Sequence, residues 1–79
     1  MTTAQMLLSL CEATGIAGLE MGAVAQAETL LSGLGTCEVP TLGSLVCRVK
    51  TEAEQPHVVL TAHIDSIGLI VSYIEDSGF

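Results

Sequence analysis

His63 and Asp65 are the residues whose types and spacing could do chemistry in this 79-residue sequence. They follow an unbroken apolar run, Val58-Val59-Leu60, which predicts a strand covered on both faces. Ligands and catalytic groups of α/β sheets gather at the carboxyl ends of strands. A neutral imidazole there can bind a divalent cation, and a carboxylate two residues on can turn back to its other ring nitrogen and fix its tautomer. The tripeptide His63-Ile64-Asp65 is a common one, however, and by itself it favours a polar turn whose side chains hydrogen-bond to the backbone.

The other histidine, His57, lies at the opposite end of the predicted strand. Six residues of strand at roughly 3.3 Å each put it about 20 Å from His63, so the two cannot share an ion if that strand forms. No serine or cysteine has a nearby histidine that would make a nucleophile and base pair. Glu75 and Asp76 are predicted at a hairpin tip, where a solvated turn is their ordinary role. Any metal chemistry therefore depends on His63 and Asp65.

The three cysteines, Cys11, Cys37 and Cys47, form no close pair such as a CxxC motif. An odd number of cysteines in a chain without a signal peptide indicates free thiols. Cys37 and Cys47 could face each other across a hairpin, but a disulfide is not the expected state. A structural zinc site would lack its fourth ligand.

The composition indicates a piece of a larger fold or an obligate oligomer. Hydrophobic residues make up 49% and charged residues 14% of the chain, against about 25% charged in ordinary soluble domains, and the mean hydropathy is +0.62. The net charge of −7 argues against nucleic acid and anionic membranes as partners. No run approaches the roughly 20 apolar residues of a membrane span, and no Lys or Arg precedes Arg48 to start a secretory signal. We expect a cytoplasmic protein.

The pattern along the chain predicts an α/β fold with the order ααββββ. Thr2 and Gln5 fit a capping box that opens a first helix, which ends at Gly15. A second helix is predicted at 19–32. Short β-prone or apolar runs then predict strands, with a turn at 40–43 between the first two. The four predicted strands are 36–39, 44–50, 57–62 and 68–74.

Three motifs together resemble one enzyme family. The first is Thr61-Ala62-His63-Ile64-Asp65-Ser66-Ile67-Gly68-Leu69-Ile70-Val71, followed by Ile74-Glu75-Asp76-Ser77-Gly78-Phe79. The others are Gly15-Ile16-Ala17-Gly18-Leu19-Glu20 and Leu42-Gly43-Ser44-Leu45. In order and spacing they resemble the N-terminal segment of the glutamyl aminopeptidase, TET aminopeptidase and cellulase M family, which are co-catalytic metallopeptidases of clan MH. The resemblance covers nearly the whole chain.

The resemblance implies the N-terminal part of a zinc-peptidase-like mixed-sheet catalytic domain over 1–67, and the start of an inserted β-rich dimerisation domain over 68–79. It implies His63 as a metal ligand and Asp65 as the catalytic-site residue that orients it. Two divalent ions, zinc or cobalt, would complete the active site of an aminopeptidase that hydrolyses N-terminal residues from peptides. The implied partners are peptide substrates, the rest of the catalytic domain, and further copies in dimers or a tetrahedral dodecamer. One ligand cannot hold a catalytic ion, so the chain alone is expected to be inactive.

Several positions depart from the family pattern. Ser66 stands where the family usually has Glu, which removes a carboxylate beside the metal segment. Ala17, Ser44 and Pro40 replace the usual Ser, Asn and Asp. These departures leave open a non-catalytic assembly module that has kept the scaffold and lost the chemistry, and also another amide hydrolase of the clan, such as a deacylase.

Overall fold

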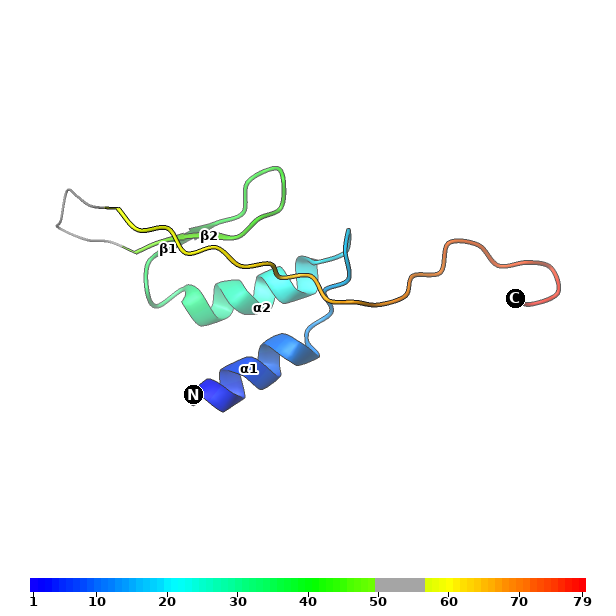
Figure 1. Ribbon diagram of the computed structural model, residues 1–79, viewed down its shortest axis with the longest axis horizontal. Coiled ribbons are helices and arrows are strands. Elements are labelled where there is room, and N and C mark those ends of the chain that lie inside the picture. The colour runs from blue at the N-terminus through cyan, green and yellow to red at the C-terminus, as the bar shows by residue number, and fades with distance from the viewer. Residues whose placement is uncertain (50–56) are drawn as a thin grey trace.

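Two helices and a two-stranded antiparallel sheet are the regular elements of the residues that the structure describes (Figure 1). The computed structural model describes residues 1–49 and 57–79. A small α/β arrangement is therefore confirmed for the first two-thirds of the sequence. In chain order the elements are α1 (Thr3–Glu12), α2 (Met21–Leu31), β1 (Thr36–Glu38) and β2 (Val46–Arg48).

Helix α1 begins with the predicted capping box. The backbone N–H of Gln5 donates to the Thr2 hydroxyl at 3.2 Å, and the backbone N–H of Thr2 donates to Gln5 Oε1 at 2.8 Å. These two bonds satisfy donors that the first turn of a helix leaves free. The helix ends at Glu12, three residues before the predicted stop at Gly15, because Ala13 already has extended backbone.

Helix α2 supplies the small core of the described residues. Its buried apolar side chains are Ala23 and Val24, and the helix packs against α1 and the turn between the two helices. The backbone N–H of Ala23 donates to the carbonyl of Thr14 at 2.9 Å. Gly15 lies so close that a Cβ added to it would come 2.9 Å from Cβ of Ala23. The turn is thus fixed to the first turns of α2.

Strands β1 and β2 form an antiparallel hairpin in which the two cysteines face each other. Cys37 lies opposite Cys47, and Glu38 lies opposite Val46. The predicted turn at 40–43 is confirmed, since the N–H of Gly43 donates to the carbonyl of Pro40 at 2.8 Å. The predicted end of the second strand, Lys50, lies outside the described residues.

Residues 57–79 differ from the prediction. The expected strands at 57–62 and 68–74 do not form, and beyond the contact of Ser66 with Gly15 the segment extends away from the helices toward the C-terminus (Figure 1). Its apolar side chains are exposed, with Leu60, Ile67 and Leu69 each more than nine-tenths accessible. A strand needs a hydrogen-bonded neighbour, and the described residues offer this segment a single bridge, between Ile16 and Ser66. The apolar run thus predicted a burial that the described residues do not provide.

The last residues form the predicted turn. The N–H of Gly78 donates to the carbonyl of Glu75 at 2.9 Å, and Gly78 has a φ of 96°, which glycine adopts without steric cost. In the described part of the chain, no helix has the length and apolar character needed to cross a membrane.

Candidate metal-ligand site at His63

The segment that carries His63 is fastened to the turn between α1 and α2. The backbone N–H of Ser66 donates to the carbonyl of Gly15 at 2.6 Å, and the Ser66 hydroxyl donates to the same oxygen at 3.4 Å. Ile16 and Ser66 form the parallel bridge. These bonds bring together two of the three sequence motifs.

Gly68 allows this close approach. A Cβ at Gly68 would overlap the Cγ2 methyl of Ile16, so a side chain here would push the segment away from the turn. Glycine is the residue that permits such close passage of two backbones. The sequence analysis did not single out this role, although Gly68 lies within the family motif.

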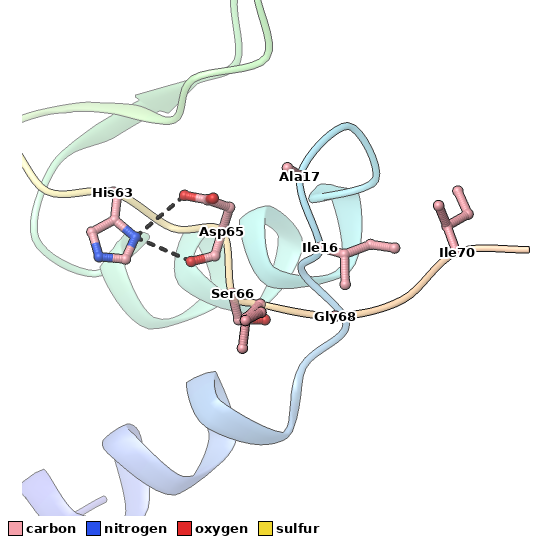
Figure 2. Close-up of a pocket in the computed structure, with 8 residues that line it drawn as sticks. Ile16, Ala17, His63, Asp65, Ser66, Gly68 and Ile70 are labelled. Carbon is pink, nitrogen blue, oxygen red and sulfur yellow. Dashed lines mark hydrogen bonds and ion pairs between the residues drawn. The ribbon is translucent and has the colours of Figure 1, made fainter.

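His63 and Asp65 lie side by side at one end of this segment (Figure 2). His63 Nδ1 is 3.3 Å from Oδ1 of Asp65 and 3.1 Å from the backbone carbonyl oxygen of Asp65. A backbone carbonyl oxygen and a carboxylate oxygen both accept hydrogen bonds. In the neutral ring, Nδ1 is therefore the nitrogen that carries the proton. Nε2 then keeps its lone pair, on a side chain that is 86% exposed. In metal-binding histidines, the ring nitrogen that does not bind the metal commonly donates to a carboxylate or a backbone carbonyl in this way, which fixes the tautomer.

A shallow groove runs from this pair along the segment (Figure 2). Ile16 and Ala17, from the turn between the helices, line it beside the 63–70 segment. His63 and Asp65 lie at one end of the groove and Ile70 at the other. The polar groups are therefore gathered at one end, and the rest of the lining is mainly apolar.

Among the described residues, the groove holds one imidazole, His63, and one carboxylate, Asp65. They contain no group of three or more His, Cys, Asp or Glu side chains that could together hold an ion. Glu75 and Asp76 belong to the C-terminal turn, and His57 is exposed at the start of the 57–79 segment. His63 thus has the donor chemistry of a first ligand, and an ion would need further ligands from outside this set.

Ser66 brings a neutral hydroxyl to the groove in place of a carboxylate, and this hydroxyl donates to the Gly15 carbonyl. Its role is to hold the segment in place. The sequence indicated Ser66 as the place of a missing carboxylate and Gly15 as a helix end and the start of a motif, and it did not predict the contact between them. The available sign of this contact in the sequence was that Gly15 and Ser66 both belong to motifs of the same family pattern.

Comparison with known proteins supports the family resemblance. The family model described as M42 glutamyl aminopeptidase matches residues 43–79. A curated protein of Acetivibrio thermocellus, named as an aminopeptidase, is 33% identical over 70 residues, covering 84% of this chain and 21% of the relative. The chain thus spans about a fifth of the length of that relative. No solved structure matches the chain.

Proposed function

This chain is a relative of the M42 glutamyl aminopeptidases, and on that premise we propose that it is the N-terminal part of a metallo-aminopeptidase, a hydrolase that removes N-terminal residues from peptides. The observation that carries the proposal is the His63–Asp65 pair, with its 3.3 Å contact, inside the matched segment. His63 is the proposed ligand of one of two divalent ions, zinc or cobalt. Asp65 is a positioning residue that holds the proton on Nδ1.

The chain's own residues orient the ligand. Asp65 keeps the imidazole in the tautomer whose Nε2 lone pair is free, and the Ser66–Gly15 bonds fix the segment against the turn. When bound, a pair of such ions polarises a scissile carbonyl and lowers the pKa of a bound water. A single histidine does not hold a catalytic ion, so the 79-residue chain alone is proposed to be inactive.

We further propose that residues 1–67 belong to the catalytic domain and that 68–79 begin an inserted β-rich dimerisation domain. The exposed apolar side chains of 57–74 support the presence of further protein around this segment, since they need neighbours on both faces. The proposed neighbours are the rest of a mixed catalytic sheet and, beyond it, further copies in dimers or a tetrahedral dodecamer. The proposed location is the cytoplasm.

The test uses the complete protein and three single variants: His63→Ala, Asp65→Asn and His57→Ala. Bound metal is counted by elemental analysis, and activity is measured on amino-acid amides.

We expect His63→Ala to lose one ion per subunit and its activity. Loss of an orienting partner typically weakens metal affinity about 10- to 100-fold, so Asp65→Asn should need correspondingly more added metal. His57→Ala is the matched control and should behave as the unchanged protein. A His63→Ala protein with two ions and full activity would overturn the proposal.

Ser66 favours a second candidate function, a non-catalytic assembly module. Its side chain replaces the family's usual Glu, and its hydroxyl is committed to the Gly15 carbonyl. That function predicts defined oligomers that take up no zinc or cobalt and release no amino acids. Metal-dependent release of amino acids by the complete protein would exclude it.

A further inference from the structure

Cys37 and Cys47 form a pair of free thiols at the centre of the hairpin. They are direct partners in the ladder between β1 and β2, and both are half-buried. The third cysteine, Cys11, lies exposed on α1. The two hairpin thiols are therefore the ones that the backbone places opposite each other.

The surroundings of the pair differ on its two sides. Cys47 Sγ donates to the carbonyl of Leu31, at the end of α2, over 3.9 Å. Partial burial raises the pKa of the Cys37 thiol, and so do its hydrogen bond and charge interaction with Cys47 and the negative charge of Glu28. Cys37 is thus a weaker source of thiolate at neutral pH than an ordinary cysteine.

We propose that Cys37 and Cys47 are a modification site for small-molecule disulfides of the glutathione class, which convert the two thiols into a cross-strand disulfide joining β1 to β2. The site stands apart from the proposed peptidase function and shares no residue with the His63 segment. Nothing in the metal-ligand proposal depends on it.

The backbone geometry is compatible with this bond. Directly opposed residues in antiparallel strands have Cα atoms about 4.5–5.5 Å apart, and disulfides usually span about 4.4–6.8 Å between Cα atoms. The hairpin therefore needs no large movement to close the bond. Cys11 has no partner of this kind among the ladder residues.

The reaction is two successive thiol–disulfide exchanges. The Cys47 thiolate attacks one sulfur of the small disulfide, whose S–S bond breaks and releases one small thiolate. The Cys37 thiolate then attacks the Cys47 sulfur of the mixed disulfide and releases the second. The two protein thiols lose two electrons, the small disulfide gains them, and the two protons end on the two small thiols.

The test treats the full, reduced protein with oxidised glutathione under native conditions, blocks remaining thiols with iodoacetamide, and maps disulfides by mass spectrometry. We expect the 37 and 47 peptides to be joined with a mass lower by two hydrogen atoms, and Cys11 to be alkylated or to carry glutathione. At early times glutathione should be found on one of the two hairpin cysteines, as the mixed disulfide that precedes the internal bond. Cys11→Ser should leave the internal bond unchanged, and Cys37→Ser should stop at the Cys47 mixed disulfide.

A parallel reaction in urea separates the folded geometry from closeness in sequence. Loop closure in an unfolded chain favours the Cys37–Cys47 bond only about fourfold over Cys11–Cys37. Native conditions should raise that preference by a further tenfold or more. Equal distributions with and without urea, or stable mixed disulfides on all three cysteines in native buffer, would overturn the proposal.

Discussion

Replacing Gly35 with Ala should open the hairpin between β1 and β2. A Cβ at this position would overlap the carbonyl oxygen of Arg48 and come 2.8 Å from its carbonyl carbon and 3.0 Å from Cα of Val49. All three are backbone atoms, so no side-chain rotation can relieve the contact. The two strands must separate at the end where β1 begins.

Gly33→Ala is the matched control, two residues away. A Cβ at Gly33 meets no atom within 4 Å, and neither glycine has a positive φ. Both substitutions stiffen the unfolded chain to the same degree, by about 0.4–1 kcal/mol, and this effect cancels between them. Forcing extra volume into an occupied site costs about 1–3 kcal/mol, so the difference between the variants isolates the clash.

The assay is amide hydrogen exchange, read by mass spectrometry on peptides that cover residues 36–48 of the complete protein. A cost of about 1–3 kcal/mol raises the opening constant, and hence the exchange rate, about 5- to 150-fold in Gly35→Ala relative to Gly33→Ala. The yield of the Cys37–Cys47 disulfide should fall in the same variant. Equal protection of the hairpin in both variants would refute the reasoning.

Three further outcomes are expected. Thr2→Ala removes one bond of the capping box and should cost about 1 kcal/mol, seen as lower helicity of the first helix by circular dichroism or exchange. Because only the thiolate reacts and the folded surroundings raise the pKa of Cys37, unfolding the protein in urea should move the half-maximal alkylation of Cys37 to lower pH; an unchanged pH profile would contradict the assigned surroundings. Ser66→Ala keeps the backbone bond to Gly15 and should change the stability of that contact by no more than about 1 kcal/mol, whereas Ser66→Pro removes the N–H donor and should release the segment, as measured by exchange of the residues around it.

The local parts of the fold were predictable because their signals are local. The pair of Thr2 and Gln5 specifies the start of α1, and the second helix, predicted at 19–32, is observed at Met21–Leu31. The hairpin followed from β-prone residues on either side of a Pro–Gly turn, and its register set Cys37 opposite Cys47. Caps, turns and short ladders depend on residues within a few positions of each other.

The strands predicted at 57–62 and 68–74 failed for a different reason. An apolar run indicates that a segment is buried, but it does not indicate which other elements bury it. Residues such as Leu60 and Leu69 are exposed because their covering surfaces are not among the described residues. The contact of Ser66 with Gly15 was equally hidden, since its two halves lie 51 residues apart and neither half is unusual alone.

The candidate site likewise has a local part that the sequence predicts and a distant part that it does not. The two-residue spacing of His63 and Asp65 is a local relation, and the structure has the two side chains in contact. The metal-ligand role of His63 stays a prediction, because the remaining ligands of an ion would come from distant sequence.

The bond between Ser66 and Gly15 also bears on the order in which the chain folds. Its two ends are separated by 51 residues, whereas the bonds within each helix and between the two strands of the hairpin join residues much closer in the sequence. Closing so long a loop first would cost more entropy than closing it after α2 and the hairpin have shortened the path. The segment that carries His63 therefore docks last, and weakening this bond should speed undocking while leaving the folding rate nearly unchanged. Newly made protein would acquire its helices and hairpin before it acquires the geometry of its candidate metal ligand.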